Sequence, residues 1–251
     1  MNRFGEVTHA FEKVSSTQDV AKEMAKEGAE EGTVVVAEEQ NRGRGRLGRL
    51  WLSPPGGLWF SVILRPPVRP TEAPKITLLA AVAVALALCE LFQLEALIKW
   101  PNDILIGGKK VAGILTEASA ELNKLIFVVL GIGINANVDV GDFPHNLLMP
   151  ATSLSAELKE EVDLSSLLEG CLKHLEAEYV LFKKEQFEKI LDQWRKLSAI
   201  LGKKVKVSSP AETLVGKASD IDQSGALILQ LDTGEKRLVQ VGDVSILQSK
   251  K

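Results

Sequence analysis

The stretch GRGRLGRLW, residues 43–51, decides between two fold classes. Gly43, Gly45 and Gly48 satisfy the G-x-G-x-x-G pattern of dinucleotide-binding folds. That pattern requires a helix that begins among the glycines and an acidic residue about 20 positions later. Here the glycines run into WLSPPGG, where consecutive prolines exclude a helix, and no acidic residue follows before Glu72. The stretch therefore argues against a doubly wound dinucleotide-binding sheet. The chain also lacks the G-x-x-x-x-G-K-[ST] pattern of a P-loop.

The same stretch is suited to gripping an anion. Arg44, Arg46 and Arg49 are fixed cations whose forked donors match carboxylate and phosphate oxygens. The interleaved glycines let the backbone approach a ligand closely, and the indole of Trp51 can stack on a planar ring. A solvated basic turn is the alternative, and it is the commoner outcome for such a charge run taken alone.

Composition restricts the classes of protein further. The chain has 251 residues, enough for one large domain or a large one with a small one. Hydrophobic residues make up 45% and charged residues 25%, as in ordinary globular proteins. The net charge is −3 and the pI is near 5.8, so the arginine-rich stretch is a local basic feature. A nucleic-acid-binding domain is usually basic, and we therefore expect no DNA partner.

The two cysteines and the apolar runs indicate the cellular compartment of the protein. Cys89 and Cys171 are too few and too far apart for a disulfide framework, and we expect buried free thiols. The first residues lack the apolar core of a signal peptide. The longest apolar run, residues 76–89, is too short to span a bilayer and fits a core helix. These features predict a cytoplasmic protein without a membrane partner.

The rest of the first 201 residues predicts strands and helices in mixed order. Residues 15–19 (SSTQD) predict a helix N-cap, with Gly28 or Gly32 closing that helix. Strands are expected at residues 33–37, 58–64, 97–100 and 125–130, a hairpin at 104–106 and 111–117, and helices at 73–91 and 164–201, the last in two pieces. Hairpin-like strand pairs with segregated helices indicate an α+β fold with a mixed or largely antiparallel sheet.

The character of the chain changes after Gly202. Short strand-like runs separated by turn residues follow, at 204–207, 214–218, 226–229 and 236–241. This pattern is typical of a small β-barrel module of about 50 residues. We therefore predict a large domain at residues 1–201 and a small β domain at residues 202–251.

Three further motifs accompany the arginine-rich stretch. They are KWPND at residues 99–103, KKVAGIL at 109–115 and GIGIN at 131–135. Together they offer cations, glycine backbone and polar side chains, but no nucleophile–base triad. The three histidines, His9, His145 and His174, show no metal-ligand spacing, and we predict no metal site.

These motifs resemble those of the biotin protein ligase family. The matching elements, in the family's order and at similar spacing, are Ser16-Thr17-Gln18, Gln40, GRGRLGR at 43–49, Trp51, KWPND, KVAGIL at 110–115, GIGIN, and a strand–turn–strand at 216–229. The resemblance implies a mixed sheet with flanking helices, like that of class II aminoacyl-tRNA synthetases, plus a C-terminal SH3-like β-barrel.

The resemblance also implies an activity. A family member activates biotin with ATP as biotinyl-5′-AMP and transfers it to a lysine of biotin carboxyl carrier protein, part of acetyl-CoA carboxylase or a related enzyme. Mg²⁺ would accompany ATP, and a homodimer is expected. Only fifteen residues precede Ser16, which leaves no room for the DNA-binding domain of bifunctional members, so we expect the monofunctional type.

Residue roles carry over position by position. The expected catalytic residues are Arg44, Arg46 and Lys110, which offset charge on the carboxylate and the α-phosphate. The expected biotin-binding residues are Ser16, Thr17, Gln18, Gln40, Gly43, Arg44, Gly45, Arg46, Lys110, Gly113, Leu115, Gly131 and Gly133. The expected ATP-binding residues are Arg49, Trp51, Lys99, Asn102, Asp103 and Asn135. Family members often have Asn at the position of Gln18, which leaves its contact to biotin open.

Three alternatives remain at this point. A lipoate–protein ligase shares the fold and the acyl-adenylate chemistry, although KWPND and the repeated arginines favour biotin. A nucleic-acid binder would use the arginines on phosphates, against the acidic pI. A non-catalytic relative would bind biotin without activating it.

Overall fold

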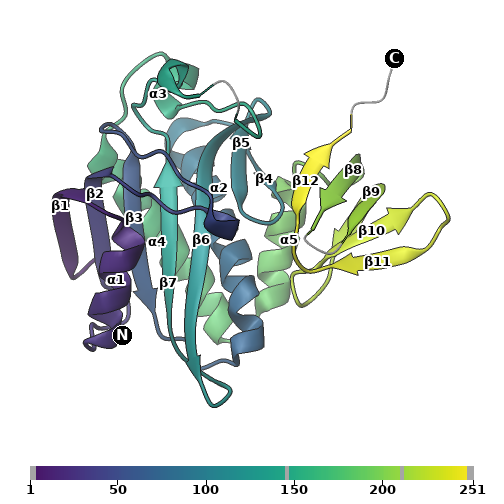
Figure 1. Cartoon of the computed structure of the whole chain (residues 1–251), viewed down its shortest axis with the longest axis horizontal. Helices are drawn as coiled ribbons and strands as arrows, with labels where there is room; N and C mark the ends of the chain where they lie inside the picture. Colours follow the sequence, from purple (N-terminus) through teal and green to yellow (C-terminus); the bar gives the residue numbers. More distant parts are fainter. Residues whose placement is uncertain (1–3, 145–146, 210–211, 248–251) are drawn as a thin grey trace.

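The larger part of the chain is built on a seven-stranded mixed sheet (Figure 1). The structure is a computed structural model, and it describes residues 4–144, 147–209 and 212–247. The strands, in spatial order, are β1 (Thr8–Val14), β2 (Val34–Gln40), β3 (Leu58–Leu64), β7 (Lys124–Ile134), β6 (Lys109–Glu121), β5 (Asp103–Ile106) and β4 (Ala96–Lys99). β1 pairs with β2 in parallel, and all other pairs are antiparallel. The predicted mixed sheet is confirmed.

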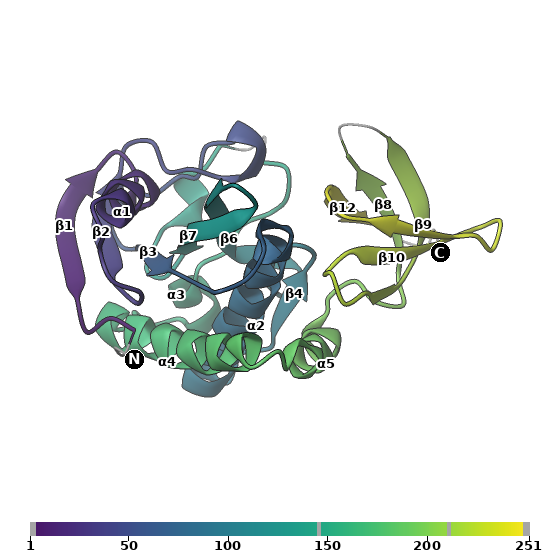
Figure 2. The same cartoon turned by 90° about the horizontal axis from the view of Figure 1, so that it is seen from below.

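Helices cover the two faces of this sheet unequally (Figure 2). The helices are α1 (Thr17–Lys26), α2 (Ala73–Phe92), α3 (Leu154–Leu158), α4 (Leu164–Lys183) and α5 (Phe187–Leu197), with 3-10 turns at Arg46–Gly48, Pro70–Glu72 and Val140–Asp142. α1 alone packs Ala21 and Ala25 on a small cluster with Val35, Ile63 and Val129. α2, α4 and α5 cover the opposite face and form the main core.

α2 is the predicted core helix. In the described chain, one helix, Pro70–Phe92, is long and apolar enough to cross a membrane, and 61% of its most apolar window is buried. It packs against α4, α5 and strands β4 and β6, so most of its apolar residues face protein. A helix that is hydrophobic all round is expected in such a position.

A second, antiparallel sheet follows α5 (Figure 1). Its strands, in the order β11-β10-β9-β8-β12, are β11 (Lys236–Val239), β10 (Leu227–Leu231), β9 (Thr213–Ile221), β8 (Lys204–Ser208) and β12 (Asp243–Ile246). Several polar contacts attach it to the larger part, among them two that involve Trp100 and Arg195. Trp100 Nε1 donates to the carbonyl oxygen of Gly225 at 3.0 Å, and Arg195 Nε donates to Asp220 Oδ1 at 2.8 Å. The domain boundary at residues 201 and 202 stays a prediction, and residues 248–251 lie outside the described residues.

Several elements differ from the expectations. β1 was not predicted, because its sequence THAFEKV is largely polar and the strand is exposed at the sheet edge. β7 does not end at Leu130 but runs through the glycines to Ile134. α5 ends at Leu197 instead of residue 201, because the Ser198 hydroxyl accepts from the amides of Ile200 and Leu201 and turns the chain. α3 and β12 were not expected.

Candidate active site

The arginine loop, residues 43–49, is a hairpin-like excursion between β2 and β3. Its base is closed by the Gln40–Ser53 bridge, and the amide of Trp51 donates to the carbonyl oxygen of Gly43 at 2.8 Å. A Cβ at Gly43 would lie 2.3 Å from the backbone oxygen of Trp51, so only glycine fits there. Leu47 adopts the left-handed region with φ 57° at the tip. The backbone of the loop is therefore folded on itself.

An uncharged hydrogen-bond network lies below one end of the loop. The amide and hydroxyl of Thr17 donate to Gln40 Oε1 at 2.8 and 3.1 Å, and Gln40 Nε2 donates to Ser53 Oγ at 2.7 Å. Thr17 Oγ1 also lies 2.9 Å from Ser61 Oγ, which donates to Gln18 Oε1 at 3.0 Å. The network ties the start of α1 to β2 and β3.

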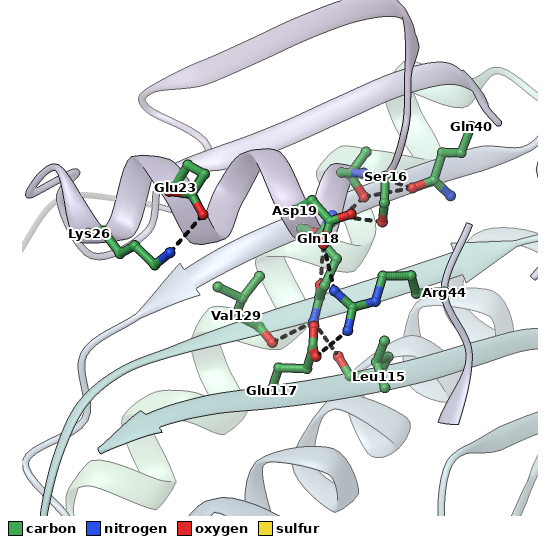
Figure 3. Close-up of polar contacts among 12 residues, drawn as sticks. Ser16, Gln18, Asp19, Glu23, Lys26, Gln40, Arg44, Leu115, Glu117 and Val129 are labelled. Carbon is green, nitrogen blue, oxygen red and sulfur yellow. Dashed lines mark hydrogen bonds and ion pairs between the residues drawn. The ribbon is translucent and has the colours of Figure 1, made fainter. Parts of the chain in front are cut away.

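The start of α1 is fixed by its own side chains as well (Figure 3). Ser16 is the N-cap, and its hydroxyl accepts from the amide of Gln18 at 3.3 Å. Gln18 Nε2 donates to the carbonyl oxygens of Val129 at 3.0 Å and Leu115 at 3.4 Å. A Cβ at Gly131 would lie 2.5 Å from Gln18 Oε1, so any other residue at this position would displace the Gln18 amide.

Arg44 spans the gap between α1 and β6 (Figure 3). Its Nη1 lies 2.5 Å from Asp19 Oδ1, and its Nη2 lies 2.7 Å from Glu117 Oε1. The hydrogen bond to Asp19, together with attraction to both carboxylates, raises the pKa of the guanidinium above its usual value. Both terminal nitrogens of Arg44 are thus engaged by protein carboxylates.

The indole ring of Trp51 packs against strands β6 and β7 of the sheet. Cβ atoms at Gly113 and Gly133, which face each other on β6 and β7, would lie 2.9 and 2.5 Å from its ring. Lys110 Nζ is 5.0 Å from the ring centroid, close enough for a cation–π contact. Within the described part of the chain, the buried Trp51 Nε1 has no hydrogen-bond partner.

Two lysines share one carboxylate beside this ring. Lys110 Nζ lies 2.5 Å from Asp103 Oδ1, and Lys99 Nζ lies 3.3 Å from Asp103 Oδ2. The β5–β6 register shifts at this point and leaves Val111 unpaired, which accounts for Lys110 lying on the same face as Gly113. Lys109, in contrast, pairs with Glu157 at 3.4 Å.

The remaining loop arginines reach toward KWPND and the second sheet. Arg46 Nη1 donates to Asn102 Oδ1 at 3.0 Å, and burial lowers the pKa of its guanidinium. Arg49 forms an ion pair with Asp243 at the start of β12. The hydrogen bond from Arg49 lowers the pKa of the Asp243 carboxyl. The loop therefore contacts both parts of the chain.

Asn135 follows β7 at the far end of the site. Its Nδ2 donates to the carbonyl oxygen of Thr152 at 3.0 Å, and Asn102 Nδ2 donates likewise to Ile114 at 3.0 Å. Asn135 is buried, and its Oδ1 has no hydrogen-bond partner among the residues that the structure places. An unpaired buried acceptor is costly, so a water molecule or a bound ligand would complete its hydrogen bonding.

A cavity of about 390 Å³ lies between the arginine loop and β6. Its walls are the loop itself, with Leu115 and Glu117 of β6 on the other side. In the described ranges, no three His, Cys, Asp or Glu side chains are grouped as metal ligands, and His145 lies outside them.

The structure brings together most of the residues that the motifs singled out, on α1, β2, the β4–β5 hairpin, β6, β7 and the arginine loop, whereas Arg49 turns to Asp243 of the second sheet. Sequence reasoning missed Asp19, Ser53, Ser61, Glu117 and Asp243, which pair with predicted residues. Ser61 left a signal, as the one hydroxyl in the apolar strand LWFSVIL. Asp243 left none, because its partner is 194 positions away.

Comparisons with known proteins agree with this architecture. The model of the biotin/lipoate A/B protein ligase family matches residues 10–135, and that of the biotin protein ligase C-terminal domain matches residues 200–247. The bifunctional ligase/repressor BirA of Bacillus subtilis is 42% identical over 226 residues, covering 90% of this chain and 70% of that protein. The biotin–[acetyl-CoA-carboxylase] ligase of Mycobacterium tuberculosis is 34% identical, covering 85% and 79%.

A solved structure extends the likeness to the whole fold. The biotin protein ligase from Aquifex aeolicus in complex with biotin and ATP superposes with a TM-score of 0.82 and 30% identity. The match covers 97% of this chain and 100% of that one. The chain belongs to the biotin/lipoate A/B protein ligase family, with a biotin protein ligase C-terminal domain after it. The expected family and fold class are confirmed.

Proposed function

We propose that the protein is an ATP-dependent ligase that activates biotin as biotinyl-5′-AMP and transfers it to a lysine of biotin carboxyl carrier protein. The observation that carries the proposal is the meeting of an uncharged polar network and a cationic cluster under one loop. The polar network suits a neutral ring system, and the cationic cluster suits phosphate. The relative from Mycobacterium tuberculosis, a biotin–[acetyl-CoA-carboxylase] ligase, supports the acceptor class.

The first step joins two anions. A carboxylate oxygen of biotin attacks the α-phosphorus of ATP, and the bond to the pyrophosphate oxygen breaks. Lys99 and Lys110 share the single carboxylate of Asp103, and Arg46 faces the neutral amide of Asn102. This corner of the site therefore carries a surplus of positive charge, which stabilises charge on the transferring phosphate.

The biotin end is assigned to the uncharged network. The ureido ring presents one carbonyl oxygen and two N–H groups, which pair with hydroxyl and amide side chains such as Ser16, Thr17 and Gln40. Gln18 has its amide engaged by Ser61 and by two strand carbonyl oxygens, so a direct contact would require an exchange of partners. The remaining proposed contacts line the approach: Gly43, Gly45, Gly113, Leu115, Gly131 and Gly133.

The nucleotide end is assigned to Trp51 and the polar residues around it. The indole would stack on adenine, and Asn135 Oδ1, which has no hydrogen-bond partner in the described part of the chain, would accept from an exocyclic amine. Asn102, Asp103, Lys99 and Arg49 complete this end. Both oxygens of Asp103 are engaged by lysines, so Mg²⁺ would be held mainly by ATP phosphates and water.

In the second step, a lysine amine of the carrier attacks the acyl carbon and AMP leaves. Water would destroy the mixed anhydride, so the site must exclude solvent between the two steps. The arginine loop is the segment placed to do this. We further propose a homodimer, in keeping with the family resemblance, and a cytoplasmic protein that binds neither DNA nor a membrane. Sedimentation velocity tests the dimer.

The decisive experiment mixes the purified protein with ATP, Mg²⁺, an apo carrier domain, and either biotin or lipoate. We expect a mass increase of the carrier equal to one biotinyl group, and biotin-dependent exchange of label between pyrophosphate and ATP. Label transfer from lipoate alone would make the protein a lipoate ligase. Biotin binding without exchange would make it a non-catalytic binder.

A further inference from the structure

We propose that Asp19 is a positioning residue. Together with Glu117 it holds the Arg44 side chain in place, and this contact of three residues, called the bolt below, keeps the arginine loop closed over the biotin end of the site. The enzymatic part of this inference rests on the proposed function. The bolt itself is made only of the chain's own side chains.

The three side chains come from three separate segments. Asp19 lies in the first turn of α1, Glu117 lies on β6, and Arg44 is part of the arginine loop. The guanidinium bridges the two carboxylates beside Gln18, at 2.5 and 2.7 Å (Figure 3). One side chain therefore fastens the loop across the gap between helix and sheet.

Backbone hydrogen bonds also hold the base of the loop, but they do not involve its middle. The amides of Asn41 and Arg42 donate to the carbonyl oxygens of Val14 and Ser15, at 3.0 and 2.9 Å. Arg46 and Arg49 pair with Asn102 and Asp243, on the nucleotide side. On the biotin side, Arg44 is the loop arginine whose two ends rest on carboxylates.

The charges decide what Arg44 can do. Two carboxylates surround one guanidinium, so this corner has no surplus positive charge for a substrate anion. A direct bond from a terminal nitrogen of Arg44 to the biotin carboxylate would have to displace Asp19 or Glu117. Arg44 is thereby suited to holding the loop, while Arg46, Lys99 and Lys110 offset the phosphate. Exposed ion pairs are individually weak, so the bolt can open for ligand exchange.

The test compares Asp19→Asn with Glu23→Gln. Glu23 lies one turn further along α1 and pairs with Lys26 at 2.7 Å, away from the loop (Figure 3). Both variants remove one paired carboxylate from the same helix. We expect Asp19→Asn to release biotinyl-5′-AMP about two- to fivefold faster than wild type, with saturating adenylate formation unchanged. Glu23→Gln should match wild type in both.

Double substitution separates the bolt from a general loosening of the helix. Arg44→Gln should release the adenylate at least as fast as Asp19→Asn. Adding Asp19→Asn to Arg44→Gln should then produce no further increase, because the partner is already gone. The proposal would be wrong if the two substitutions increased the release rate multiplicatively. It would also be wrong if Asp19→Asn and Glu23→Gln released the adenylate equally fast.

Limited trypsin digestion gives a readout independent of catalysis. Cleavage within the arginine loop of the ligand-free protein should be faster in Asp19→Asn than in wild type or Glu23→Gln. If the wild type forms no biotinyl-5′-AMP, the proposed function fails, and digestion still tests the bolt. If the adenylate forms and Asp19→Asn changes neither release nor digestion, the bolt is wrong.

Discussion

The two ends of the site are built from different kinds of interaction. At the biotin end, Thr17, Gln40 and Ser61 form a chain of neutral hydrogen bonds. At the nucleotide end, Lys99 and Lys110 meet on Asp103. Neutral groups discriminate by geometry and keep their strength in salt, whereas charges act on a reacting phosphate from several directions. In the proposed function, recognition and activation are therefore assigned to separate elements under a shared loop, recognition to α1, β2 and β3 and activation to β4, β5 and β6.

Lys110 offers the strongest test of this division between the two ends of the site. Lys110→Ala should lower biotin-dependent pyrophosphate exchange by about 10²- to 10³-fold, the usual cost of losing one group that stabilises transition-state charge. Biotin binding should weaken far less. The control is Lys109→Ala, since Lys109 pairs with Glu157 elsewhere. Equal losses in both variants would assign the effect to the strand and not to Lys110.

A second change acts on the nucleotide end through shape alone. Gly133→Ala places a Cβ within 2.5 Å of Trp51 Nε1, which forces the ring to move. Overpacking of this kind typically costs about 1–3 kcal/mol, so we expect KM for ATP to rise about tenfold or more. Gly133 is also among the proposed biotin contacts, so the dissociation constant of biotin, measured by calorimetry, should rise, but by less than KM for ATP. A selective loss of biotin binding would contradict the assignment of this end.

The matching change at the biotin end is Thr17→Val. It removes the hydroxyl that contacts both Gln40 and Ser61 while keeping the shape of the side chain. Buried polar partners left unpaired cost about 1–3 kcal/mol, so biotin affinity should fall by about tenfold. KM for ATP should not change. If ATP binding suffers equally, the two ends are not separate.

The smallest effect is expected where the loop meets the second sheet. Asp243→Asn should raise KM for ATP about two- to fivefold, as for a partly exposed ion pair. Asp232→Asn, which breaks the Lys204 pair on the same sheet, is the control. The pKa of Asp243 is lowered in the folded protein, so its stabilisation is complete at neutral pH and is lost as pH falls through that pKa. Unfolding midpoints of wild type and Asp243→Asn should accordingly converge in acid.

The sequence predicted those parts of the fold that local pattern determines. The apolar runs of β3 and α2 and the N-cap Ser16 have local causes and lie where expected. β1 escaped because an edge strand needs few apolar residues, and its place depends on pairing with β2.

The candidate site divides in the same way. The motifs singled out Lys110, Arg46 and Trp51, and the structure brings them together. The orientation of Lys110 depends on a bulge at Val111 that strand alternation does not reveal. Asp19 and Asp243 could not be chosen from sequence, because their importance comes from the arginine each one meets across the fold.

The position of Trp51 has a practical consequence. Trp59, Trp100 and Trp194 are fully buried in the core, whereas Trp51 is partly exposed at the site, over Gly113 and Gly133. A bound molecule should therefore change the fluorescence of Trp51 more than that of the three buried tryptophans. A change of intensity on adding nucleotide or vitamin would provide a label-free optical signal. Stopped-flow mixing could then time ligand arrival without any attached dye.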